Sequence, residues 1–249
     1  MHTLAAMLAR ATGNRPLSNW TILCDFDGTI SVNDTTDALL ERFGQPGWEA
    51  IEQAWRRGEI GSRECMARQI ALVEAVPEAL DDWLDGVAID PAFTAFVAAA
   101  RAIGVPLAVL SDGLDHAIAR VLRRHGLGDL PVKANRLEAV GESGWRLDFP
   151  HARPECPSGN CKCAAAGDAH AGQKRVLLIG DGASDFCVAG EADFVFAKGR
   201  LVEHCRTAAI PHLPITDFRD ALTLLPMLVE GDIAADGQVV APPDRTIAA

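Results

Sequence analysis

Three short apolar runs along the chain each end in an acidic or hydroxyl side chain, and a glycine follows almost at once. The runs are residues 20–26 (WTILCDF), 105–110 (VPLAVL) and 175–179 (RVLLI). Short apolar runs bounded by turn residues are typical of strands that are buried on both faces of a parallel sheet. A fourth run, residues 192–197 (ADFVFA), has the same character. We therefore predict three buried parallel strands and a further strand in the fourth run.

Helical periodicity lies between the predicted strands and is clearest at residues 92–103 and 114–125. Strands that alternate with helices predict an α/β fold with a doubly wound, mostly parallel sheet. Residues 136–149 (RLEAVGESGWRLDF) instead predict a β-hairpin that turns at GESG. Ligands bind such sheets at the carboxyl ends of the strands, which is where the polar residues lie.

A long insertion separates the first two predicted strands. Between Asp27 and Ser111 lie 83 residues, more than one crossover helix needs. Apolar residues recur there at helical spacing in three stripes: Leu39, Leu40 and Phe43; Trp48, Ile51 and Trp55; Met66, Ile70 and Val73. We predict a helical cap at residues 33–85, inserted in a core formed by residues 1–32 and 86–232. Its tryptophans are expected to be core residues rather than ligand contacts.

Neither end of the chain has a periodic pattern. The first 16 residues contain no acid and two arginines but no apolar core, which favours a loose arm over a targeting peptide. Residues 233–249 are expected to form a mobile tail. No apolar run reaches the length of a membrane span, so no membrane association is expected.

Composition narrows the classes of protein further. A hydrophobic fraction of 49% allows a full globular core, and the net charge of −11 argues against nucleic-acid binding. The seven cysteines are an odd number. Cys24 lies in an apolar run, and Cys65 and Cys187 lie in predicted helices. A secreted disulfide framework therefore does not fit, and we predict a cytoplasmic protein.

Carboxylates gather after two of the predicted strands. Asp25 and Asp27 are two residues apart and face the same way on an extended segment. Like charges so close need a cation, a shared proton or strong hydrogen bonds. Asp181 and Asp185, in the GDGASD segment, follow another strand. Hard oxygen donors without a nearby histidine suit Mg²⁺, so these four residues predict a magnesium site.

These residue types allow phosphoryl transfer. A carboxylate beside a metal ion can attack phosphorus and form an aspartyl phosphate, and a second acid can carry the proton. Phosphoryl transfer also needs a hydroxyl or amide donor and a cation. Ser111, at a strand end before a predicted helix, fits the donor role together with the free N–H groups of that helix. A simple helix N-cap is the alternative interpretation of Ser111.

The segments DFDGTI and GDGASD, with Ser111 and a lysine between them, resemble the haloacid-dehalogenase-like (HAD) superfamily of aspartyl-phosphate phosphatases. The insertion is similar to the cap of the phosphoserine-phosphatase-like subgroup. The resemblance implies a Rossmann-like core, Mg²⁺ and a small phosphomonoester substrate. It also implies roles for single residues: Asp25 is the nucleophile, Asp27 the general acid/base and Ser111 a phosphate ligand; Asp181 binds Mg²⁺ with Asp25 and the Asp27 carbonyl, Asp185 supports the metal, and Gly28, Asp112 and Gly113 contact the substrate.

Three lysines precede GDGASD: Lys133, Lys162 and Lys174. Lys174 directly precedes a predicted strand and so lies at the wrong end of it, whereas Lys133 leads into the hairpin. Lys162 can open a helix, and its NCK setting is similar to that of phosphoethanolamine/phosphocholine phosphatases. We predict Lys162 as the catalytic lysine.

Two branches of the superfamily are similar to this chain. CDFDGTISVND, the region around Trp48 and HARPECPSGNCKC resemble methionine-salvage methylthiopentenyl-phosphate phosphatases. SDG, NCK and GDGASDFC are similar to the phosphoethanolamine/phosphocholine branch. Phosphoserine phosphatases match less well. Asp34 can stand for their cap acid, but Arg68 lies only near the place of their cap arginine.

A cysteine-rich segment offers soft ligands: His151, Cys156, Cys161 and Cys163. They are the kind of donor that binds Zn²⁺, but the C-x4-C-x-C spacing is not one of the usual paired patterns. Reduced thiols in an ordered loop are the alternative.

A phospho-signalling module similar to response-regulator receivers would use the same acids, hydroxyl and lysine. The length of the chain argues against it, and so does Asp27, because a stable phosphoaspartate would not have a built-in base beside it. A catalytically inactive scaffold is not favoured, since no motif position is missing.

Overall fold

The computed structural model describes residues 19–234, and its centre is one seven-stranded sheet with the order β4-β3-β2-β1-β5-β6-β7. Its strands are β1 (Trp20–Cys24), β2 (Leu107–Leu114), β3 (Val132–Val140), β4 (Gly144–Asp148), β5 (Arg175–Gly180), β6 (Phe194–Ala197) and β7 (His212–Pro214). All neighbouring strands are parallel except β4, which pairs antiparallel with β3. The predicted doubly wound α/β sheet and the hairpin are confirmed. The predicted N-terminal arm and the tail beyond residue 234 lie outside the described residues.

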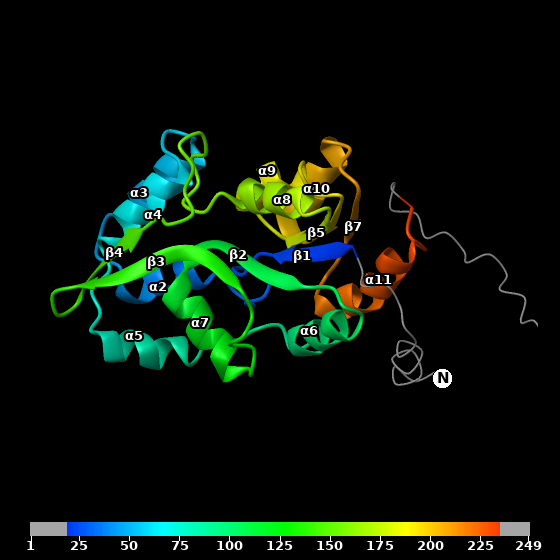
Figure 1. Ribbon diagram of the computed structural model, residues 1–249. Coiled ribbons are helices and arrows are strands. Elements are labelled where there is room, and N and C mark those ends of the chain that lie inside the picture. Colours follow the sequence, from blue (N-terminus) through cyan, green and yellow to red (C-terminus); the bar gives the residue numbers. More distant parts are fainter. Residues whose placement is uncertain (1–18, 235–249) are drawn as a thin grey trace, which may run out of the picture.

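Helices cover both faces of the sheet. They are α2 (Thr35–Phe43), α3 (Trp48–Arg56), α4 (Ser62–Ile70), α5 (Pro77–Leu84), α6 (Phe93–Ala102), α7 (Asp115–Arg124), α8 (Lys162–Ala171), α9 (Phe186–Ala189), α10 (Gly199–Thr207) and α11 (Phe218–Glu230). Figure 1 shows α8, α9 and α10 on one side of the sheet and α6, α7 and α11 on the other. On β1, Ile22 packs in the cluster under α6 and α11, whereas Leu23 packs in the cluster under α8 and α10. This alternation is the two-residue period of a strand with both faces buried.

Strand β1 lies at the centre of the sheet, where the order of the strands reverses. It pairs with β2 on one side and β5 on the other, so that Leu23 lies beside both Ala108 and Leu178. A crevice opens at the carboxyl ends of strands at such a switch point. Asp25 and Asp181 directly follow β1 and β5, and the fold therefore delivers both carboxylates to this crevice.

Strand β2 is longer than the sequence pattern predicts. It continues through Ser111 to Leu114, with an irregular register on β3 between Leu110 and Leu114, and α7 begins only at Asp115. The expectation that Ser111 directly precedes a helix or caps it is therefore wrong. The Ser111 hydroxyl instead accepts a hydrogen bond from the Gly113 N–H at 2.9 Å.

Helices α2–α5, here called the cap helices, fill most of the insertion. Their apolar stripes join one cluster that includes Leu39, Leu40 and Ile70 and also Trp145 of β4. The indole of Trp145 donates a hydrogen bond to the Ala75 carbonyl at 2.9 Å. The cap helices are thus fixed to the hairpin edge of the sheet. The predicted boundaries of the cap at residues 33 and 85 stay a prediction.

The tryptophans of the cap helices do not all share one environment. Trp48 and Trp83 pack against the apolar cluster of the cap, as expected. Trp55 is half-buried and lines two neighbouring hollows. The expectation of a core role is therefore wrong for Trp55, because its side chain lines these hollows and is not part of the apolar cluster of the cap.

Two further features of the fold bear on the expectations from sequence. Residues 19–234 contain no helix that is long and apolar enough to cross a membrane. All seven cysteines are free thiols, in line with the absence of a disulfide framework.

Candidate active site

A buried lysine bridges two aspartates at the centre of the crevice. Lys162 is the first residue of α8, and its ammonium lies 2.9 Å from Asp25 Oδ1 and 2.7 Å from Asp185 Oδ1. Burial alone would lower the pKa of Lys162, but Asp185 and Asp25 outweigh it and raise that pKa. Burial, and next the charge of Asp185, raise the pKa of Asp25 although Lys162 opposes them. One buried cation between two acids leaves the site with an excess of negative charge.

Three carboxylates in this cluster are close enough to share a metal ion. Asp25, Asp181 and Asp185 each offer an oxygen within 4.8 Å of the others, the only such group within residues 19–234. Asp181 accepts a hydrogen bond from Thr29 Oγ1 at 3.2 Å. Gly28 has a φ of +69°, and a Cβ there would lie 2.6 Å from Asp181 Oδ2, so the turn needs glycine. An all-oxygen donor set fits a hard divalent cation.

The Asp27 carboxyl faces a different part of the crevice and is not one of these three. Its Oδ1 accepts a hydrogen bond from the backbone N–H of Thr35, the first residue of α2, at 2.8 Å. A Cβ on Gly113 would collide with its Oδ2, which shows that Asp27 lies against the β2 segment. Burial, followed by the charge of Asp34, raises the pKa of Asp27 to about 7. Such a carboxyl can both give and take a proton near neutral pH.

Ser111 and Asp112, which are neighbours in β2, have different surroundings. Ser111 is buried, and its hydroxyl lines the crevice beside Asp27. Asp112 instead uses both carboxylate oxygens within the protein. Its Oδ1 accepts from the Asn160 N–H at 2.7 Å, and its Oδ2 accepts from Ser62 Oγ at 2.9 Å. Its carboxylate therefore joins protein segments, although it lies at the edge of the crevice.

Of the three lysines considered from sequence, Lys162 reaches the carboxylates. Lys133 lies 3.7 Å from Asp168 with both side chains largely exposed. Lys174 directly precedes β5, at the end of that strand opposite the crevice. A fourth lysine, Lys198, was missed: its ammonium donates to the Gly28 and Thr29 carbonyls at 3.1 and 3.2 Å. Its place directly after a strand was the signal that could have found it.

The crevice is a cleft of about 260 Å³ between the strand ends and the cap helices. Its cap side carries Asp34, Thr36, Asp37, Glu52, Trp55, Arg56, Ser62, Cys65, Met66 and Gln69. Glu52 accepts hydrogen bonds from Arg56 Nε at 2.8 Å and from Gln69 Nε2 at 3.2 Å. Burial, and then the charges of Asp34 and Glu52, raise the pKa of Asp37 to about 6. Acids thus outnumber basic groups on this wall.

The two cap residues suggested for an amino-acid substrate lie apart. Asp34 lines the cleft and caps α2 by accepting the Asp37 N–H at 2.9 Å. Arg68 does not line the cleft; it pairs with Glu64 at 3.3 Å on an exposed helix face. Arg56 and Arg200 line the cleft instead. Glu52 and Arg56 have the i, i+4 spacing of a helical ion pair, which was a signal for Arg56 in the sequence.

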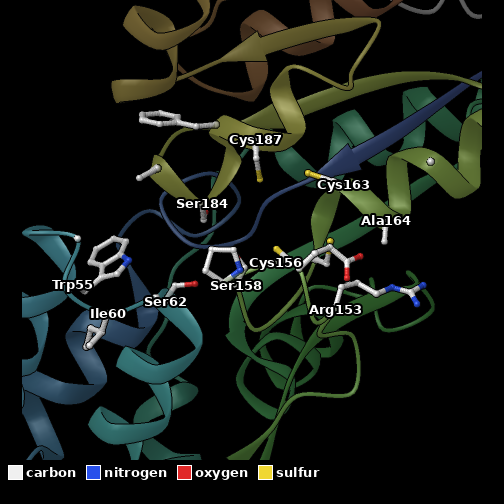
Figure 2. A pocket seen from close by; sticks show the side chains of 18 of the residues that line it. Trp55, Ile60, Ser62, Arg153, Cys156, Ser158, Cys163, Ala164, Ser184 and Cys187 are labelled. Carbon is white, nitrogen blue, oxygen red and sulfur yellow. The ribbon is translucent and has the colours of Figure 1, made fainter.

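A second hollow, of about 1050 Å³, adjoins the cleft, and Trp55, Ser62 and Ser184 line both. Figure 2 shows Cys156, Cys163 and Cys187 around this second hollow, which Cys161 also lines. Cys161 contacts Cys156, and Cys163 contacts Cys187.

His151, the fourth predicted zinc ligand, does not line the second hollow. Burial and the neighbouring Lys133 and Arg136 lower its pKa. Within residues 19–234, no three of the predicted zinc donors come within 4.8 Å of one another. The zinc hypothesis therefore gains no support from the geometry, and metal analysis is its test.

Comparisons with known proteins agree with this geometry. A family model described as haloacid dehalogenase-like hydrolase matches residues 22–190. A 2-hydroxy-3-keto-5-methylthiopentenyl-1-phosphate phosphatase from Geobacillus thermodenitrificans (strain NG80-2) is 30% identical over 213 residues, covering 83% of this chain and 96% of its own length. A protein of the same name from Brevibacillus brevis is 29% identical over 212 residues, covering 82% and 94%. A solved structure described as a phospho-aspartyl intermediate analogue of phosphoserine phosphatase has a TM-score of 0.65 at 18% identity, covering 84% of this chain and 99% of that one.

Proposed function

Since the chain belongs to the haloacid dehalogenase-like hydrolase family, we propose that it is a Mg²⁺-dependent phosphatase that cleaves a small phosphomonoester through an aspartyl phosphate on Asp25. The observation that carries this proposal is the buried contact of Lys162 with Asp25 beside two further carboxylates. Such an arrangement provides a nucleophile and a cation at one point, which phosphoryl transfer requires. A cleft of about 260 Å³ suits a small substrate.

Asp25 is the attacking group in the proposed reaction. Its Oδ1 is held by the Phe26 N–H at 2.8 Å and by Lys162, so we assign Oδ2 to the attack. Oδ2 forms a bond to phosphorus as the bond from phosphorus to the leaving oxygen breaks. Asp27 gives its proton to that oxygen, then takes a proton from a water that attacks the phosphoenzyme and releases phosphate from Asp25. The Ser111 hydroxyl, which accepts from Gly113, keeps its own proton for a phosphate oxygen.

Asp25, Asp181 and Asp185 would hold the magnesium ion. When bound, Mg²⁺ supplies positive charge that offsets the charge of the phosphoryl group. Removing divalent ions with a chelator should abolish hydrolysis of p-nitrophenyl phosphate, and Mg²⁺ should restore it. Full activity in chelator would contradict the metal assignment.

The first substrate to test is 2-hydroxy-3-keto-5-methylthiopentenyl-1-phosphate, the compound in the names of the relatives that cover most of this chain. A panel of phosphorylated metabolites compared by kcat/KM tests this choice. A higher kcat/KM for this compound than for any other member supports it, and negligible turnover contradicts it. We also propose a cytoplasmic location, which the free cysteines favour.

A phosphoethanolamine or phosphocholine phosphatase is the second candidate, and the wall of the cleft on the cap side favours it. Asp34, Asp37 and Glu52 place negative charge there, and Trp55 adds an aromatic ring. Carboxylates and an aromatic face are the groups that bind an ammonium substituent. Phosphoserine is less favoured, because Arg68 lies outside the cleft and Arg56 already pairs with Glu52.

A further inference from the structure

The loop at residues 149–161 joins β4 to α8 and ends one residue before Lys162. Here it is called the β4–α8 loop. Arg63, at the start of cap helix α4, holds this loop by hydrogen bonds. The Arg63 N–H donates to the Pro157 carbonyl at 3.1 Å. Its guanidinium donates to the carbonyls of Ser158 at 3.2 Å, Arg153 at 2.9 Å and Cys156. One side chain on the cap thus satisfies three carbonyls of the loop.

Close packing between Gly61 and Pro157 also holds the loop against the cap. Gly61 is the N-cap of α4, and a Cβ at that position would lie 2.9 Å from the Pro157 carbonyl oxygen. Real Cβ atoms essentially never come that close to another heavy atom, so the loop packs directly against the cap backbone at Gly61. The β4–α8 loop and the beginning of α4 therefore cannot move independently without breaking several contacts.

The other end of the loop is held by the core. Asn160 is 2% exposed, and its side-chain amide donates to the carbonyls of Ser111 at 3.1 Å and Lys133 at 2.7 Å. Its N–H donates to Asp112 Oδ1, while Asp112 Oδ2 accepts from Ser62 next to Arg63. Asp112 therefore joins the core, the cap and the loop at one carboxylate.

We propose that Arg63 and Asp112 are positioning residues that couple the placement of the cap to the placement of Lys162. A cap seated on the core holds the β4–α8 loop, and the loop aims the Lys162 ammonium at Asp25. Loss of the Arg63 or Asp112 contacts would release the loop and loosen that ammonium. The kinetic part of this inference rests on the proposed phosphatase activity.

Kinetics of Arg63→Ala and Asp112→Asn test the coupling. Because Lys162 acts on the reacting groups, each variant should lower kcat for p-nitrophenyl phosphate about tenfold and change KM less than about twofold. Guanidinium ion should restore part of the kcat of Arg63→Ala. Arg57→Ala is the matched control, since that guanidinium pairs with Glu59 on the exposed cap surface. A change confined to KM, or no rescue, would overturn the proposal.

The double variant sharpens the test. If both residues act through one loop, Arg63→Ala with Asp112→Asn should be about as slow as the slower single variant. Two independent roles would instead multiply, giving about a hundredfold loss of kcat. A multiplied loss overturns the coupling even when each single variant is slow.

Amide hydrogen exchange gives a readout that needs no activity. The N–H groups of Asn160 and Cys161 bond to Asp112 and to the His151 carbonyl, so both should exchange faster in Arg63→Ala than in wild type or Arg57→Ala. Unchanged exchange there overturns the coupling. If the wild-type protein hydrolyses no phosphomonoester, the proposed function fails while this measurement still decides the coupling.

Discussion

The floor and the cap wall of the cleft are built in different ways. On the floor, Asp25, Lys162 and Asp185 are 4%, 2% and 0% exposed and come from segments far apart in the sequence. On the wall, Glu52 and Arg56 sit one helical turn apart on α3, and the Arg56 side chain is 58% exposed. The floor therefore depends on the whole sheet, whereas this ion pair on the wall depends on local helical spacing.

This difference indicates that one region carries out the reaction and the other selects the substrate. Removing one partner of a buried ion pair leaves the other charge unpaired and lowers the free energy of unfolding by about 3–5 kcal/mol, whereas an exposed pair contributes about 0–1 kcal/mol. We therefore expect substitutions of the buried floor residues to cost more stability than substitutions of the Glu52–Arg56 pair. We infer that the floor carries the chemistry and that the wall adapts to the leaving group.

The largest effect is expected at the nucleophile. Asp25→Asn removes the attacking carboxylate and should lower kcat by a factor of about 10⁴ or more. Hydrolysis of p-nitrophenyl phosphate measures the loss, with Asp129→Asn, an acid paired with Arg101 on the surface, as the control. Activity that survives in Asp25→Asn would refute the nucleophile assignment.

Asp27→Asn should come next, with a loss of about 10³ in kcat, because only the proton carrier is removed. Asp25 can still attack, so a phosphoenzyme should accumulate slowly and be trapped by acid quench and detected by mass spectrometry. The same quench of Asp25→Asn should show none. A phosphoenzyme in neither variant would contradict the aspartyl-phosphate route.

Lys162→Met tests the floor for both chemistry and stability. It leaves Asp25 and Asp185 buried without their cation, so the free energy of unfolding should fall by about 3–5 kcal/mol without Mg²⁺. Loss of the positive charge of Lys162 beside Asp25 should lower kcat about 10²-fold. Urea unfolding and kinetics measure the two effects. Lys133→Met, an exposed lysine, is the control, and an equal loss there would reverse the choice of lysine.

The smallest effect is expected on the wall. Glu52→Gln keeps an acceptor for Arg56 but removes one charge, so the KM or Ki for phosphocholine should rise about fivefold with kcat for p-nitrophenyl phosphate unchanged. Glu64→Gln, which lies outside the cleft beside Arg68, is the control. An unchanged KM or Ki for phosphocholine would argue against a substrate with a cationic leaving group and favour the methylthiopentenyl phosphate, whose leaving group is uncharged.

Much of the fold could be predicted because the burial of a strand shows in the local pattern of apolar residues. The runs that became β1 and β5 are mostly apolar, since both faces of a central strand are covered. The hairpin turn at GESG was equally clear. The end of β2 was missed because Ser111, Asp112 and Gly113 resemble a turn, whereas in the structure they form the irregular part of β2 between the β3 pairings of Leu110 and Leu114.

The site residues likewise divide into those that a local sequence pattern marks and those that only tertiary contacts reveal. Asp25, Asp27 and Asp181 mark strand ends, and a choice among three lysines pointed to Lys162. Lys198 had only its place after a strand as a signal, and Arg63 had none, because their partners are backbone carbonyls of segments distant in the sequence. Hydrogen bonds to a carbonyl place no demand on the type of the accepting residue, so they leave no pattern to read.

The sequence by itself determined that polar residues follow the predicted strands, that two acids lie together in CDFDGTI and that a helical insertion separates the first two strands. Those features depend on local periodicity and on what lies next to what along the chain. Only the tertiary structure decided that Asp112 joins loop and cap, that Trp55 faces the cleft and that Arg68 does not. The physical reason is that side chains from separate elements meet only after the sheet and the cap helices have packed, and packing, not spacing, decides which groups become neighbours.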